Sequence, residues 1–205
     1  MKKVFSRFTL LITLAFFCLV SAQAVFACGV ERWGVKVAQD KHVNYFFKDN
    51  SISTGKLQPF LPTTIAKLHQ EDYPFEKLTG KPPKWSYTQR AGIAEFRIWT
   101  INAILTKKKN EADEDYHLVL KSGGKFLVAE IPSAQCVEDT VEPLKGMIIQ
   151  ARSDFDEWFS KQTKKTFNQK VRITGIGFFD RVHGAEGASP NGIELHPIIK
   201  IEFLQ

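Results

Sequence analysis

The sequence predicts a mainly β protein: an OB-like, five-stranded Greek-key barrel with one helix between its third and fourth strands, preceded by an irregular N-terminal arm. Two observations favour this fold class. From residue 91 onward, the apolar patterns follow the order strand, strand, strand, helix, strand, strand, which is the order of an OB-fold. The composition, 43% hydrophobic and 24% charged, is typical of a globular domain and excludes collagen-like and disordered chains.

The first three strands are predicted from two-residue alternation and from the turns between them. Residues 93–105 form a long strand whose apolar side changes parity after Ile98, as in a bulged or strongly curved strand. The polar tract 107–115 is the following turn, and residues 116–121 form the second strand. A Ser-Gly-Gly turn then leads into a third strand over residues 125–132.

The remaining elements complete the order expected of the barrel. Apolar residues three or four apart predict a helix between Val141 and Gln162. Residues 169–180 form a fourth strand, with Gly175 and Gly177 marking a bend, and residues 193–203 form a fifth. The alternative fold is an open five-stranded sheet with one helix.

Residues 28–90 contain five of the nine prolines, so long regular elements are not expected there. Residues 62–70 predict one short helix, capped by Thr63 or Thr64, with Ile65 and Leu68 turned inward. The segment is too apolar for a free linker, and we expect an arm that packs on the barrel. Its large aromatic residues are Trp33, Phe46, Phe60, Phe75 and Trp85.

Residues 1–27 have the pattern of a secretory signal peptide: a basic tip, an apolar run over residues 10–20, and then small residues. Cleavage is expected after Ala24 or Ala27, and the mature chain is expected in the periplasm or outside the cell. The run is too short to span a bilayer comfortably, and no later stretch is apolar enough to do so. The segment holds three basic residues and no acid, so removing it lowers the net charge from +6 to +3.

The expected compartment determines how the cysteines are interpreted. Cys18 lies inside the predicted signal, which leaves Cys28 and Cys136 as an expected disulfide in an oxidising space. The closed loop of roughly a hundred residues would stabilise the fold by about 4 to 5 kcal/mol. The alternative is a lipoprotein modified at Cys28, which would leave Cys136 free. Phe26, where a small residue is normally required, argues against it.

Polar residues on the predicted strands form the strongest candidate site. Asp113, Asp115 and His117 are spaced two apart, and Glu130, Glu194 and His196 occupy outward positions of the third and fifth strands. Carboxylates and imidazoles on one face can bind a divalent metal or perform acid and base chemistry. The competing interpretation is that they are simply the solvated side of half-buried strands. The long loop 181–192 adds His183 as a further candidate.

Three functions are compatible with these residues. The first is a binding module whose unknown ligand lies over the outward face of the second, third and fifth strands. The second is a metal-dependent secreted hydrolase, such as a nuclease, and the third is a structural envelope protein. Nucleic acid is a weaker candidate partner, because the acids after Lys107–Lys109 cancel their charge.

A P-loop, a dinucleotide fingerprint, an HExxH motif and a nucleophile elbow are all absent. The candidate site residues make a divalent metal the one candidate cofactor, although none is expected by default, and the sequence indicates no oligomeric state.

The segments CGVERWGVK, PTTIAKL, DYHLVL, AEIPSAQC and GIGFFDRVHGAEGASPNGIELHP resemble a family of exported bacterial proteins. The most specific pair is CGxERWxVK with GIELHP, and the resemblance spans most of the mature chain. A TGTD segment often follows the VK in that family, whereas Val37, Ala38 and Gln39 precede Asp40 here. The resemblance implies export and a shared fold. It brings no assigned catalytic residues that could be transferred to this chain.

Overall fold

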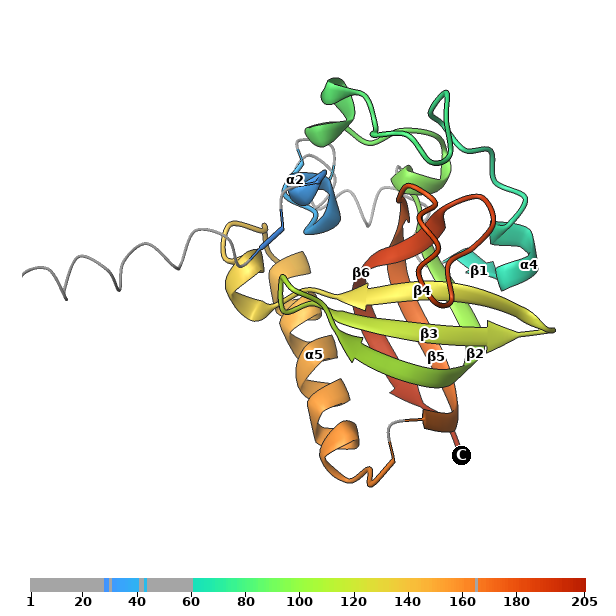
Figure 1. The fold of residues 1–205 in the computed structure, drawn as a ribbon. Coiled ribbons are helices and arrows are strands. Elements are labelled where there is room, and N and C mark those ends of the chain that lie inside the picture. Colours follow the sequence, from blue (N-terminus) through green and yellow to red (C-terminus); the bar gives the residue numbers. More distant parts are fainter. Residues whose placement is uncertain (1–27, 30, 41–42, 44–60, 165) are drawn as a thin grey trace, which may run out of the picture.

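The computed structural model describes residues 28–29, 31–40, 43, 61–164 and 166–205, and places them around a six-stranded mixed sheet (Figure 1). The prediction of a mainly β protein is confirmed. The predicted signal peptide with both cleavage sites, and the aromatic residues Phe46 and Phe60 of the arm, lie outside the described residues. Within the described part, no helix is long and apolar enough to cross a membrane.

In the described residues, six strands and three α-helices make up the regular structure. The strands are β1 (Leu61–Thr63), β2 (Ile98–Asn110), β3 (Tyr116–Ser122), β4 (Lys125–Ile131), β5 (Thr166–Phe179) and β6 (Ile193–Phe203). The helices are α2 (Trp33–Lys36), α4 (Ile65–Leu68) and α5 (Leu144–Ser160), and short 3-10 turns cover Lys84–Tyr87, Ala94–Phe96 and Ala134–Val137. In Figure 1, α5 lies along one side of the sheet, and the segment between α4 and β2 lies across one end.

The strand pairings form a closed series that begins and ends at β2. The sheet order is β1-β2-β3-β4-β6-β5, and β2 pairs with β5 as well as with β3. Most of these pairs are antiparallel. The exceptions are β1 with β2 and β4 with β6, and the latter pair is joined at Ala129 and Leu195. This last pairing brings the outward residues of β4 and β6 side by side.

Strand β2 differs from its predicted bounds at both ends. It begins at Ile98, because Ala94–Phe96 forms a 3-10 turn, and it continues to Asn110. The expectation that Lys107–Lys109 lie in a turn is therefore wrong, since these residues pair with Val119, Leu118 and His117 of β3. The change of parity after Ile98 has a different cause from the one expected. Ile98 and Trp99 are both buried, each in a different hydrophobic cluster, and the irregularity in register lies between Leu105 and Lys107.

The later elements follow the sequence pattern closely. Helix α5 buries Leu144, Ile148, Ala151 and Phe155, as the helical spacing predicts. The bend expected in the fourth strand is confirmed by register shifts on both sides of Gly175. A side chain at Gly177 would collide with the carbonyl oxygen of Ala94, so this close backbone approach requires glycine.

The N-terminal arm contains the short helix that the sequence predicts. Thr64 caps α4 by accepting a hydrogen bond from the Lys67 amide at 3.2 Å, and Ile65 and Leu68 are buried. Strand β1 was not predicted, because three residues that include Pro62 carry no readable alternation. The buried ion pair between Arg32 and Glu95 attaches the arm to the rest of the chain, and a second buried pair, Arg90 with Asp40, lies within the arm.

Candidate functional site

Strand register brings four of the candidate residues together. His117 of β3 is paired with Glu130 of β4, and the next residue along β4, Ala129, is paired with Leu195 of β6. Glu194 and His196 flank Leu195, so their side chains leave β6 on the opposite face from this core residue. The three strands therefore direct two histidines and two glutamates toward one region.

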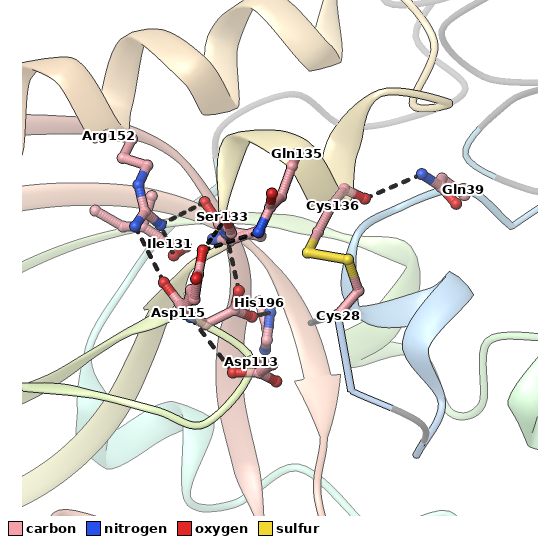
Figure 2. The surroundings of a disulfide bond; sticks show 12 residues. Cys28, Gln39, Asp113, Asp115, Ile131, Ser133, Gln135, Cys136, Arg152 and His196 are labelled. Carbon is pink, nitrogen blue, oxygen red and sulfur yellow. Dashed lines mark hydrogen bonds and ion pairs between the residues drawn. A yellow bond between two sulfur atoms is a disulfide. The ribbon is translucent and has the colours of Figure 1, made fainter. Parts of the chain in front are cut away.

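A fifth residue, Asp115, reaches this region from the turn before β3. Its Oδ1 accepts a hydrogen bond from the Ser133 amide at 2.9 Å, and its Oδ2 lies 3.3 Å from His196 Nε2. Ser133 directly precedes the 3-10 turn that contains Cys136, which forms the predicted disulfide with Cys28 (Figure 2). The disulfide therefore anchors the arm close to the residues that hold Asp115.

The five residues are buried, which the sequence did not indicate. Their exposed fractions lie between 0% for His196 and 7% for Glu130 and Glu194. The interpretation of these side chains as the solvated face of half-buried strands is therefore wrong. The loop between β5 and β6 lies against this face, where the backbone oxygen of Glu186 contacts His117, and Gly29 and Lys36 of the arm border it. We call these five residues the polar cluster: Asp115, His117, Glu130, Glu194 and His196.

His196 lies at the centre of the polar cluster. Its Nδ1 is 3.0 Å from Glu130 Oε2 and 3.4 Å from Glu194 Oε1, while its Nε2 faces Asp115. Burial alone would lower the pKa of His196. Its contacts with Asp115, Glu130 and Glu194 outweigh burial and raise the pKa well above the ordinary value. The ring of His196 therefore binds a second proton more tightly than an ordinary histidine does.

His117 and His196 share one carboxylate. His117 Nδ1 donates to Glu130 Oε1 at 2.9 Å, and its Nε2 donates to the backbone oxygen of Glu186 at 3.1 Å. Burial by itself would raise the pKa of Glu130, but the two histidines and the charge of Lys36 lower it well below the usual range. Burial alone would lower the pKa of His117, but the hydrogen bond and charge of Glu130, together with the Glu186 backbone bond and the charge of Glu194, raise it.

Glu194 has the opposite electrostatic environment to Glu130. Burial and the negative charge of Glu130 raise the pKa of Glu194 to about 7. The two glutamates therefore have pKa values on opposite sides of the ordinary value, although both contact the same histidine. At neutral pH, Glu130 is ionised while Glu194 is partly protonated.

A cavity of about 300 Å³ lies against the polar cluster and includes His117, Glu130 and Glu194 in its wall. The loop after β5, the turn before β3 and the arm complete the wall. The arm contributes Gly29 and Lys36, so it borders this face and leaves a cavity between itself and the sheet. Half of the lining residues are ionisable: the acids Glu111, Asp113, Glu130, Asp180 and Glu194, and the bases Lys36, Arg181, His117 and His183.

Lys36 has an unusual position in this cavity. Burial on its own would lower its pKa, but Glu130, Glu194, Asp180 and Asp113 together raise that pKa above the ordinary lysine value. In the described part of the chain, no carboxylate lies within ion-pair distance of its Nζ. Lys36 is therefore a charged ammonium whose stabilisation comes from several acids at longer range.

Two predicted site residues lie outside the polar cluster. Asp113 borders the cavity, and burial together with the charge of Asp115 raises its pKa. His183 also borders the cavity, but its side chain is 47% exposed and is paired with Asp180 at 3.0 Å. Sequence reasoning missed Lys36, Glu111 and Asp180 as site residues. A lysine within the otherwise apolar stretch WGVKVA was the only signal for Lys36.

Comparisons with known proteins add little to this geometry. No protein-family model matches the chain, and no curated protein matches it. Two solved structures of asparaginyl-tRNA synthetase from Entamoeba histolytica are similar at 14% identity and a TM-score of 0.33, one of them in complex with asparaginyl-adenylate. The match covers 52% and 53% of this chain but only 20% of each synthetase chain. A similarity at this level supports no conclusion about fold or function.

Proposed function

We propose that this chain is an exported, OB-like binding module that holds a small, positively charged ligand in the cavity beside the polar cluster. The closed series of pairings from β2 through β3, β4, β6 and β5 back to β2, with α5 between β4 and β5, supports the barrel. The pattern of residues 1–27 and the Cys28–Cys136 disulfide support export, because disulfides persist in oxidising compartments. The disulfide also uses the Cys28 sulfur that a lipid would need.

The single observation that carries the binding role is the acidic cavity itself. Its volume of about 300 Å³ suits a small molecule, and ligand pockets combine such a volume with a few well-placed polar groups. Five carboxylates line it, of which Glu194 is partly protonated at neutral pH, against the cations Lys36 and Arg181 and His117, whose two ring nitrogens both donate. This excess of negative charge favours a ligand that carries a positive charge.

Three small probes of different charge test this proposal by saturation-transfer NMR: putrescine (dicationic), glycine (zwitterionic) and succinate (dianionic). Putrescine should receive saturation from the protein, and succinate should not. Asp180→Asn should weaken putrescine binding by about 10-fold, because a charge-assisted hydrogen bond contributes about 1.5 kcal/mol or more. The matched control is Glu157→Gln on the exposed surface of α5. Preferential binding of succinate, or equal putrescine binding by Asp180→Asn, would contradict the proposal.

Metal-dependent hydrolysis, including cleavage of nucleic acid, is the second candidate function. It is favoured by one observation: Glu130 belongs both to the cavity wall and to a buried set of metal-binding donors with Asp115 and His196. A metal ion there could activate water beside a bound substrate. Zinc-loaded protein should then hydrolyse bis(p-nitrophenyl) phosphate, and metal-free protein should not. Equal rates in both preparations would eliminate this candidate.

A further inference from the structure

The polar cluster requires a positive charge at His196. Three carboxylates, those of Asp115, Glu130 and Glu194, approach its two ring nitrogens at 3.0 to 3.4 Å, and the ring is completely buried. A neutral imidazole has one N–H donor, so its other nitrogen would direct a lone pair at a carboxylate. Buried carboxylates without a compensating cation are strongly unfavourable. A second proton on the ring or a metal ion can supply that charge.

The geometry at Nε2 distinguishes these two sources. Within the described part of the chain, His196 Nε2 is buried and has no hydrogen-bond partner. Asp115 Oδ2 is only 3.3 Å away, but it does not lie in a hydrogen-bonding direction. A proton on Nε2 would thus lack an acceptor, and leaving a buried donor unsatisfied is costly. A lone pair on Nε2 needs no acceptor and can instead ligate a metal.

We propose that Asp115, Glu130 and His196 bind a divalent transition-metal ion. Each offers one ligand atom, and these three atoms lie within 4.8 Å of one another in a fully buried position. One imidazole nitrogen and two carboxylate oxygens form a mixed set that suits Zn²⁺ better than Mg²⁺ or Ca²⁺, which prefer oxygen ligands alone.

Each proposed ligand is oriented by a second contact, as metal ligands commonly are. The Ser133 amide holds Oδ1 of Asp115 and leaves Oδ2 for the metal. His117 holds Oε1 of Glu130, while Oε2, which lies 3.0 Å from His196 Nδ1, is the oxygen that would turn to the metal. For His196, the Nδ1 proton can be accepted by Glu194 at 3.4 Å when Glu130 turns to the metal. His117, Ser133 and Glu194 are thus positioning residues for the site.

This inference deepens the proposed function, on which it rests, because the metal is a cation held at the acidic wall of the same cavity. Glu130 is the residue that belongs to both, while Asp115 and His196 lie behind the cavity wall. The metal site and the cavity can therefore be disabled separately.

Isothermal titration of the metal-free, disulfide-intact full-length protein with Zn²⁺ tests the inference. We expect one ion per chain. Removing a residue that only positions a metal ligand weakens metal binding by about 10-fold or more, so His196→Ala, which removes a ligand itself, should weaken it by more than about 10-fold. Asp115→Asn, which keeps the size of the side chain, should weaken binding similarly. The matched control is His69→Ala, because His69 contacts the backbone of Phe126, outside the polar cluster. Circular dichroism establishes that each variant is folded.

Two outcomes would overturn the metal site: no Zn²⁺ uptake by the wild-type protein, or equal uptake by folded Asp115→Asn. These outcomes are distinguishable from failure of the binding module. Asp180→Asn should retain Zn²⁺ binding while it binds putrescine about 10-fold more weakly. Putrescine binding without Zn²⁺ uptake would refute the metal site and leave the proposed function intact.

Discussion

Arg32 and Glu95 form a completely buried ion pair that joins the N-terminal arm to the turn before β2. The guanidinium nitrogens Nη1 and Nη2 lie 2.6 and 2.8 Å from the two carboxylate oxygens, and both side chains are 0% exposed. Arg32 also donates to the backbone oxygens of Ser86 and Phe179. One residue of the arm thus satisfies groups from three distant segments, which fixes the arm beside the cavity.

Arg32→Met should lower the free energy of unfolding by about 3 to 5 kcal/mol, because removing one partner leaves the Glu95 charge buried and unpaired. Urea denaturation followed by circular dichroism measures this loss. The control is Arg172→Met, since Arg172 is 45% exposed and lies 3.9 Å from Glu202. That substitution should cost about 0 to 1 kcal/mol. Equal losses in the two variants would show that the buried pair does not hold the arm.

The elements from β3 onward could be predicted because each carries its own periodicity. The spacing of Leu144, Ile148 and Phe155 identifies α5 without any knowledge of its partners. Strand β2 could be predicted only in part, because Ile98 and Trp99 are both buried and their alternation does not indicate where the strand begins. Strand β1 depends on pairing with β2, and its three residues alone give no signal.

The candidate site shows the same division between local and distant information. Alternation along β4 and β6 placed Glu130, Glu194 and His196 on the face opposite the core. Their burial was not predictable, because the covering loop and the arm come from distant parts of the chain. Lys36 joins the cavity through the arm, so its role depends on contacts that no local pattern carries.

Reduction of the Cys28–Cys136 disulfide should destabilise the protein by about 4 to 5 kcal/mol on the chain-entropy account, because the two cysteines are 108 residues apart. Thermal unfolding with and without a reductant measures this effect. The double variant Cys28→Ser with Cys136→Ser should unfold at the same temperature under both conditions. An identical response of the wild-type protein and the double variant to the reductant would contradict the prediction.

The disulfide should also affect the cavity, because Gly29 and Lys36 of the arm form part of its wall and Cys28 directly precedes Gly29. Reduction therefore should weaken putrescine binding under conditions in which circular dichroism still reports a folded sheet. Unchanged binding after reduction would mean that Arg32 and the other arm contacts position the wall without the disulfide.

The raised pKa of Glu194 predicts how the stability of the metal-free protein depends on pH. Because this pKa is about 7 in the folded protein and the ordinary value is 4.5, the folded state binds the proton more tightly than the unfolded state. The stabilisation from this proton is complete below about pH 4.5, and it is lost as the pH rises through about 7. Above that pH, an ionised Glu194 is buried beside the Glu130 carboxylate.

Glu194→Gln isolates this effect, since glutamine has the shape of a protonated glutamate and cannot ionise. Relative to the wild-type protein, the variant should gain about 3 kcal/mol in free energy of unfolding between about pH 4.5 and pH 8, at 1.36 kcal/mol per pKa unit. The histidines are present in both proteins, so their titration largely cancels in the difference. Urea denaturation with a chelator present, at a series of pH values, gives this difference directly. A difference that stays constant across the range would show that Glu194 titrates as an ordinary carboxyl group.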